Sequence, residues 1–229
     1  MRDLTVCASL GEVELQRFAE LMHEVVLQPG APLAAEGEAA YHVFNVTSGM
    51  LKLMKLQPDG RRQIIGFLSV GDVLGLAPGK TYACGAEAVG EVRLCRFPRD
   101  RLLAMLEELP SLQHCLFVRA AGELGAAEEQ MLLLGRKAAL ERLASFVLIE
   151  AERGARRGEA ADSVELPMSR TDIADYLGLT GESVSRAFTR LAREGCIGPP
   201  QGQRLRIQRR AALAAMAGAE TATGRLSPL

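Results

Sequence analysis

The sequence has no long hydrophobic run. No stretch approaches the roughly 18 consecutive apolar residues that a membrane-spanning helix needs. Residues 1–16 carry Asp3, Glu12 and Glu14, where a signal peptide would have a continuous apolar segment. We therefore expect a cytoplasmic protein that has no membrane among its partners.

Closely spaced cysteine pairs are also missing. The cysteines are odd in number, far apart and outside any C-x-x-C pair: Cys7, Cys84, Cys95, Cys115 and Cys196. This pattern argues against a secreted disulfide framework and against a zinc finger.

The chain lacks the common catalytic motifs. It has no G-x-S-x-G, no H-E-x-x-H, no P-loop and no Rossmann fingerprint. A metal-dependent cupin-like enzyme would need clustered histidines, but His23, His42 and His114 are widely separated. Without a C-x-x-C-H motif, isolated histidines are also weak evidence for haem. We therefore predict that the protein is not an enzyme.

The net charge of −1 hides an uneven distribution. Residues 1–135 hold 12 basic and 17 acidic side chains, whereas residues 183–210 hold seven arginines and a single acidic residue, Glu194. Phosphate contacts need clustered cations, so a basic segment of this kind suits a protein that reads nucleic acid. A solvated arginine-rich surface explains the same charge equally well.

Between residues 23 and 97, turn signals alternate with short strand-like runs. The runs contain alternating apolar, β-branched and aromatic residues: Tyr41–Thr47, Leu51–Leu56, Arg62–Leu68 and Val92–Phe97. Many short strands at even spacing predict a sandwich or barrel.

From residue 98 to about residue 153 the apolar spacing changes to three and four, which predicts helices. One stripe has the heptad spacing that can pair two chains: Phe117, Ala120, Leu124, Ala127, Met131 and Leu134. A helix that packs on its own β domain would show the same stripe. A second helix is expected over residues 137–153, followed by a flexible polar linker, residues 154–162, that leads to the last domain.

Residues 169–193 have the pattern of two short helices joined by a tight turn. Ser169 and Thr180 are the expected N-caps, and Gly178 permits the turn. The two inner faces are apolar: Ile173, Ala174 and Leu177, then Val184, Ala187, Phe188 and Leu191. The side chains left facing outward on the second helix are polar: Glu182, Ser185, Arg186, Thr189, Arg190 and Arg193.

These outward side chains suit the reading of double-stranded DNA. Arginine can bridge the N7 and O6 acceptors of guanine, and glutamate can accept from a cytosine amino group. Residues 196–207 predict a wing of two short strands that brings Arg204 and Arg206 near the DNA backbone. The two helices and the wing together are predicted to form a winged helix-turn-helix. Arg170 and Thr180 are predicted as further DNA contacts.

The stretch RTDIADYLGLTGESVSR resembles the FNR branch of the CRP/FNR family of bacterial transcription regulators. The resemblance covers nearly the whole chain. It implies an α+β fold in three parts: a cyclic-nucleotide-binding-like β-roll (a jelly roll) over residues 1–97, helices that include a long dimerisation helix over 98–135, and the winged helix-turn-helix over 136–229. The E-x-x-S-R signature of the branch falls on Glu182, Ser185 and Arg186. The resemblance further implies a homodimer that reads palindromes with TTGA-type half-sites, works with RNA polymerase and controls oxygen- or redox-related genes.

The resemblance also bears on cofactors. In residues 71–88, the stretch that matches the nucleotide-phosphate cassette has no Glu or Arg at the positions where the cyclic-AMP-binding members have them, and Lys80 is its only cation. No cyclic nucleotide is therefore expected. Cys7 and Cys95 correspond to two ligands of the family's iron–sulfur cluster, which normally takes four thiolates. We predict that the chain binds DNA in air without a cluster.

Two alternatives to this prediction stay open. In the first, the chain is an oxygen-sensing iron–sulfur regulator whose other two cysteines lie upstream of Met1. In the second, it is a scaffold that acts only through protein contacts, which would leave the basic helix unexplained.

Overall fold

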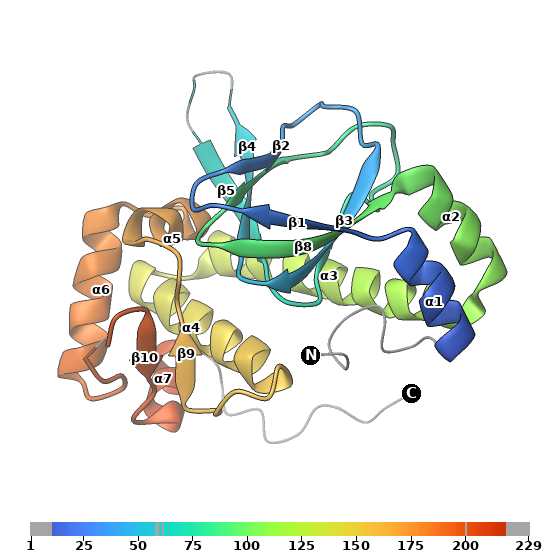
Figure 1. The fold of residues 1–229 in the computed structure, drawn as a ribbon. Helices are drawn as coiled ribbons and strands as arrows, with labels where there is room; N and C mark the ends of the chain where they lie inside the picture. Colours follow the sequence, from blue (N-terminus) through green and yellow to red (C-terminus); the bar gives the residue numbers. More distant parts are fainter. Residues whose placement is uncertain (1–10, 58–59, 61, 200, 219–229) are drawn as a thin grey trace. The chain divides into compact units, whose positions relative to one another are not determined.

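The computed structural model describes residues 11–57, 60, 62–199 and 201–218 (Figure 1). The chain divides into two compact units, with the boundary in the sequence between Ala127 and Glu128. Cys7 lies outside the described residues. The expected division into residues 1–97, 98–135 and 136–229 stays a prediction.

The first unit contains two antiparallel four-stranded sheets. In sheet order, one consists of β1 (His23–Leu27), β8 (Val92–Pro98), β3 (His42–Ser48) and β6 (Val73–Leu74). The other consists of β2 (Pro32–Ala34), β7 (Gly85–Ala88), β4 (Leu51–Leu56) and β5 (Arg62–Leu68). The predicted bounds of β4 and β5 are confirmed. β3 begins and ends one residue later than predicted, and β8 ends one residue later than predicted. The predicted β-roll is therefore present.

The core of the roll lies between the two sheets, because alternate residues of each strand point inward. Val46, Leu51 and Leu94, from β3, β4 and β8, are fully buried in one apolar cluster. A second cluster joins the roll to the helices that flank it in sequence, and there the rings of Phe18 and Phe97 lie 4.5 Å apart. Phe18 belongs to α1 (Glu12–Glu20).

The predicted helical region is divided into three helices: α2 (Arg99–Glu108), α3 (Pro110–Arg136) and α4 (Ala139–Arg156). The helix breaks between α2 and α3 at Leu109, the residue before Pro110. Proline disfavours helical geometry in the residue that precedes it. The buried face of α3 includes Leu112 and Leu116 in the first unit and Leu133 in the second.

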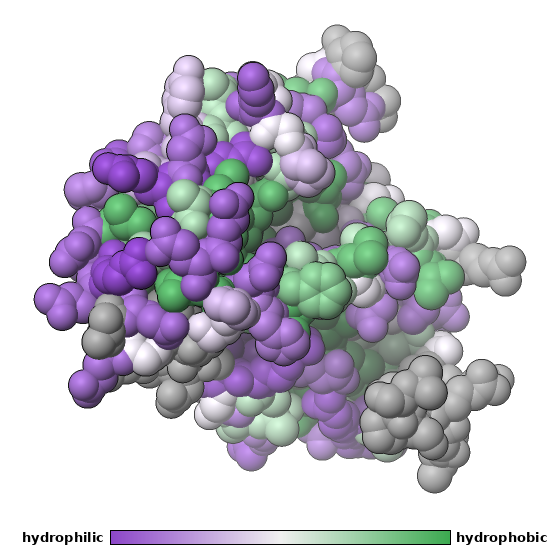
Figure 2. Space-filling view, turned by 90° about the vertical axis from the view of Figure 1, so that its right-hand side faces the viewer, coloured by the Kyte–Doolittle hydropathy of each residue, from purple (hydrophilic) through white to green (hydrophobic). Residues whose placement is uncertain are grey.

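Large hydrophobic side chains reach the surface at several places in the described part, and Figure 2 shows green areas of this kind among purple hydrophilic residues on one face. α3 carries a larger share of these exposed side chains than any other element: Phe117, Val118, Leu124, Met131 and Leu132. Single exposed apolar residues are ordinary, but a row of them on one helix indicates an interaction surface.

The second unit contains α4, β9 (Ser163–Glu165), α5 (Arg170–Leu177), α6 (Gly181–Arg193), β10 (Arg204–Arg206) and α7 (Arg210–Met216). α4 packs against α6, β9 and α7 through a buried face that includes Leu143, Phe146 and Val147. The interpretation of residues 154–162 as a linker to the last domain is therefore wrong. Residues 154–156 are the end of α4, and residues 157–162 are turns and irregular chain inside the second unit, where α4 already packs against α6 of the helix-turn-helix.

Within the described part, no helix is both long enough and apolar enough to cross a membrane.

Candidate nucleic-acid interface

The first helix of the pair, α5, begins with a complete capping box. The Ser169 hydroxyl accepts a hydrogen bond from the Asp172 backbone N–H at 3.0 Å, and the Asp172 carboxylate accepts one from the Ser169 N–H at 3.1 Å. The helix ends at Leu177, and the C-cap residue Gly178 has a left-handed φ of 62°. The predicted cap and turn are confirmed.

The second helix, α6, begins at the predicted cap. The Thr180 hydroxyl accepts from the Ser183 N–H at 3.1 Å. Four apolar side chains of α6 are buried, as expected from their spacing: Val184, Ala187, Phe188 and Leu191. The remaining face of the helix is therefore set toward solvent.

The outward side chains of α6 form one continuous surface, which we call the reading face: Glu182, Ser185, Arg186, Thr189, Arg190 and Arg193. All six are exposed, and together they line a shallow groove of about 290 Å³. The sequence predicted this grouping from helical periodicity alone. The role of these residues in DNA binding stays a prediction.

Hydrogen bonds within α6 organise the reading face. Nη1 of Arg186 lies 3.3 Å from Oε1 of Glu182, one turn earlier. The Ser185 hydroxyl donates to the Gly181 carbonyl at 2.9 Å, and the Thr189 hydroxyl donates to the Ser185 carbonyl at 3.0 Å. Each hydroxyl oxygen keeps lone pairs that can accept from a ligand.

Arg170, also predicted to contact DNA, does not join the reading face. Its guanidinium carbon lies 3.3 Å from the centre of the Phe188 ring, on the buried side of α6, and burial lowers the pKa of Arg170. The side chain thus helps to hold α5 against α6 by a cation–π contact. Its predicted contact with DNA has less geometric support than those of the six residues above.

The wing differs from the predicted one in its strand pairing. β10 pairs with β9, which precedes the helix-turn-helix, and an isolated bridge joins Ile197 to Ile207. β9 is only three residues long and carries no recognisable periodicity, so it could not be predicted from the sequence. Arg204 is exposed at the start of β10.

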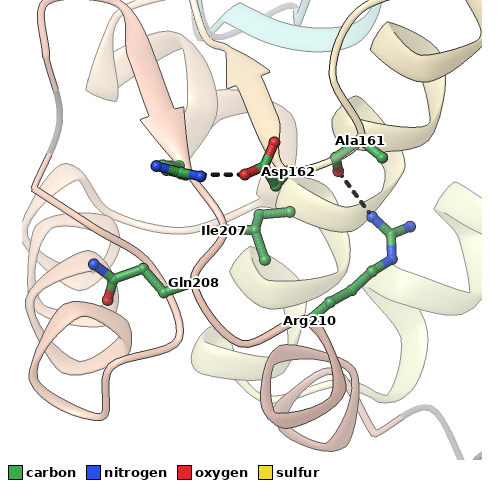
Figure 3. Close-up of a pocket in the computed structure, with 6 residues that line it drawn as sticks. Ala161, Asp162, Ile207, Gln208 and Arg210 are labelled. Carbon is green, nitrogen blue, oxygen red and sulfur yellow. Dashed lines mark hydrogen bonds and ion pairs between the residues drawn. The ribbon is translucent and has the colours of Figure 1, made fainter.

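Beside the wing lies a second cavity, of about 500 Å³ (Figure 3). Nε of Arg206 contacts the Asp162 carboxylate at 2.9 Å, and Arg210 donates to the Ala161 carbonyl at 3.3 Å. Both guanidinium groups are therefore engaged within the protein. The reading face gathers three exposed arginines on one helix and is the better candidate for an anionic ligand.

The predicted dimer seam on α3 is exposed over most of its length. Phe117, Leu124 and Met131 are 70%, 63% and 65% exposed, and Ala120 and Ala127 are exposed too. Leu134 is different, because it is half-buried and its carbonyl accepts a hydrogen bond from Arg142.

Two further side chains belong to the exposed stripe. Val118 and Leu132 are 54% and 69% exposed. They lie fourteen residues apart in sequence, so they share a face of α3. The heptad reading missed them because it followed a single register. We call Phe117, Val118, Leu124, Met131 and Leu132 the α3 stripe.

Cys95, the described member of the two predicted cluster ligands, is half-buried on β8 and packs against the apolar cluster of Phe18 and Phe97. Over the described ranges, no group of three or more His, Cys, Asp or Glu side chains is close enough to hold a metal. The described residues therefore do not assemble a four-ligand site.

The segment that matches the nucleotide-phosphate cassette is held by the protein itself. Arg99 donates to the carbonyls of Ala77 and Gly79 at 2.8 and 2.6 Å, and the Tyr82 hydroxyl donates to the His42 carbonyl at 2.9 Å. Arg99 follows the roll in sequence, and its contact with this segment was not predicted from the sequence.

Two family models match the chain. The Crp-like helix-turn-helix domain matches residues 141–216, and the cyclic nucleotide-binding domain matches residues 24–108. Among characterised proteins, the transcriptional activatory protein AadR of Rhodopseudomonas palustris is 44% identical over 197 residues, which is 86% of this chain and 82% of that protein. The nitrogen fixation regulation protein FixK of Bradyrhizobium diazoefficiens is 43% identical and covers 86% of this chain and 83% of its own length.

A solved structure is similar over the same extent. FixK2 from Bradyrhizobium japonicum superposes with a TM-score of 0.78 at 37% identity, covering 85% of this chain and 96% of that one. The predicted fold class, with its β-roll, long helix and C-terminal helix-turn-helix, is confirmed. The chain belongs to the CRP/FNR family of transcription regulators, in its FixK-like branch.

Proposed function

We propose that the protein is a homodimeric regulator that reads palindromic DNA with TTGA-type half-sites through Glu182, Ser185 and Arg186. The observation that carries the proposal is the reading face, where these three side chains lie exposed on the first turns of α6. In helix-turn-helix proteins the N-terminal residues of the second helix contact base edges. Arg186 would bridge a guanine, and Glu182 would accept from a cytosine amino group.

The remaining cations would contact phosphates. Arg190 and Arg193 continue the reading face one and two turns after Arg186, and Arg204 is exposed on the wing. Phosphate contacts fix the orientation of the protein on the duplex and carry no sequence information. The proposal therefore divides one surface into a base-reading part and a positioning part.

The α3 stripe supports the proposed homodimer. A second copy of this chain can cover the stripe with its own stripe, because a two-fold axis brings the same apolar patch of each copy together. Two copies would present two reading faces, which is what a palindrome requires.

We also propose that RNA polymerase is a partner, that the protein is cytoplasmic and that it regulates transcription without being an enzyme. The support is that the relatives are named as transcriptional activators or nitrogen fixation regulators. The proposed role in oxygen- or redox-related control rests on the resemblance of residues 170–186 to the FNR branch. Transcription in vitro from a promoter that carries the palindrome tests the polymerase contact.

We propose that DNA binding needs neither an iron–sulfur cluster nor a cyclic nucleotide. For the cluster, the support is that the described residues contain no group of three or more side chains that could ligate it. For the nucleotide, the support is that Arg99 already holds the cassette segment through the carbonyls of Ala77 and Gly79. Anaerobic reconstitution with iron and sulfide, followed by absorption spectroscopy and DNA binding before and after air, tests the first point. Binding lost on oxygenation together with a bound cluster would establish the oxygen-sensing alternative.

Selection from a random duplex library tests the proposed recognition. We expect enrichment of inverted repeats of TTGA at one fixed spacing. Enrichment of single, unrepeated sequences would contradict the homodimer, and no enrichment would contradict base reading.

A further inference from the structure

Arg142 joins three segments of the second unit. Its Nε donates to the Lys137 carbonyl at 2.8 Å, its Nη1 to the Leu177 carbonyl at 2.9 Å and its Nη2 to the Leu134 carbonyl at 3.0 Å. Leu134 belongs to the last turn of α3, and Leu177 is the last residue of α5. One guanidinium on α4 therefore bridges the C-terminal ends of two other helices.

Gln130 makes a second link between the same two helix ends. Its Nε2 donates to the Tyr176 carbonyl at 2.9 Å. Gln130 precedes Leu134 by one turn of α3, and Tyr176 is the neighbour of Leu177 in α5. Two side chains thus connect the last turns of α3 to the last turn of α5.

The site is closely packed. A Cβ at Gly178, the C-cap residue of α5, would lie 3.5 Å from Nη1 of Arg142 and 3.6 Å from Cδ2 of Leu134. The turn of the helix-turn-helix therefore lies directly against Arg142 and the end of α3.

The chemistry of arginine suits this position. The last carbonyls of a helix have no partner within the helix, and a cation there is favourable. The guanidinium is planar and holds its donors in a fixed fork, so it sets the relative direction of the carbonyls that it contacts. A lysine at this position would keep the positive charge but would lose the fixed, planar arrangement of donors.

We propose that Arg142, with Gln130, is a positioning residue that fixes the helix-turn-helix on the last turns of α3 and thereby sets the half-site spacing that the dimer accepts. This inference rests on the proposed function. Met131 and Leu132 of the α3 stripe lie on the same turns of α3 as Gln130 and Leu134. A fixed reading helix beside the seam of each copy gives the dimer a fixed distance between its two reading faces.

The expected sensitivity follows from the geometry of DNA. Adding one base pair between the half-sites moves one of them by about 3.4 Å along the axis and turns it by about 35°. A firmly held pair of reading faces cannot follow this change, whereas a loosely held pair can.

The experiment measures binding of the full chain to palindromes whose centre is shortened or lengthened by one or two base pairs. We expect the wild type to lose about tenfold or more in affinity when the best spacing changes by one base pair. In Arg142→Lys and in Gln130→Met this loss should shrink to about threefold or less. Arg156→Lys, at the exposed last residue of α4, is the matched control and should behave as the wild type.

One further readout and the choice of Gln130→Met separate positioning from general damage to the fold. The cost of a wrong base inside a half-site should be the same in the variants and the wild type, because the reading face itself is unchanged. Gln130→Met also guards against misfolding. The buried Oε1 of Gln130 has no hydrogen-bond partner within the described residues, so this change removes one hydrogen bond and one unsatisfied acceptor together.

The outcomes distinguish this inference from the proposed function. Full spacing discrimination in both variants, with a discriminating wild type, would overturn the positioning role and leave the dimeric reader intact. A wild type that accepts all spacings equally would overturn the dimeric reader and the positioning role with it.

Discussion

Glu182 and Arg186 form an exposed ion pair across one turn of α6, with 3.3 Å between Oε1 and Nη1. An exposed pair at this spacing contributes only about 0.3–0.5 kcal/mol to stability. The pair can therefore open at little cost, as the proposed contacts of both side chains with bases require. The place of the two side chains on the reading face follows from their positions on α6 and not from the pair.

Arg186→Ala should weaken binding to the cognate palindrome by about 1–3 kcal/mol and relax discrimination at one guanine, because a bidentate contact to N7 and O6 is lost. Titration of duplexes with each base at that position measures this effect. If the variant loses equal affinity for cognate and random duplexes, Arg186 does not read a base.

Arg190→Ala should weaken binding to all sequences alike, because a phosphate contact carries no sequence information. The slope of log affinity against log salt concentration should become shallower by about one. Titrations at several salt concentrations give this slope. A loss confined to the cognate sequence would make Arg190 a base reader.

Leu124→Asp should shift the protein from dimer to monomer, because it places an unpaired charge in the α3 stripe next to its own copy. Leu132→Asp should do the same, which tests the part of the stripe that the heptad pattern missed. Sedimentation velocity measures both. Leu103→Asp is the control, since Leu103 is another exposed apolar residue but lies on α2. An unchanged dimer in both stripe variants would place the interface elsewhere.

Burial raises the pKa of Tyr176 to about 12, from an ordinary value near 10. The folded state thus favours the neutral phenol. Its contribution to the free energy of unfolding is complete below pH 10 and is lost as the pH rises toward 12, by at most about 3 kcal/mol. Denaturant unfolding from pH 8 to pH 12 should show a smaller decline in Tyr176→Phe than in the wild type. Identical pH profiles would mean that Tyr176 does not govern this range.

Local rules predicted the helix-turn-helix well. Ser169, Gly178 and Thr180 act through atoms only a few residues away, so their roles follow from sequence order. The same holds for β4 and β5, whose alternating residues pair across a hairpin.

Contacts between distant segments could not be predicted in this way. The stacking of Arg170 on Phe188 and the pairing of β9 with β10 depend on how helices and strands meet. The three hydrogen bonds of Arg142 go to backbone carbonyls, and any residue can supply a carbonyl. The burial of Leu134 could not be predicted either. Its heptad position placed it in the dimer seam, but its side chain is half-buried within the protein.

The most direct test of the proposed dimeric reader is the mass and affinity of its complex with one duplex that carries two inverted TTGA half-sites. Sedimentation equilibrium should show two chains on each duplex. Competition at physiological salt should show binding about a thousandfold or more tighter than to a scrambled duplex of equal length. One chain per duplex, or equal affinity for the scrambled sequence, would contradict it.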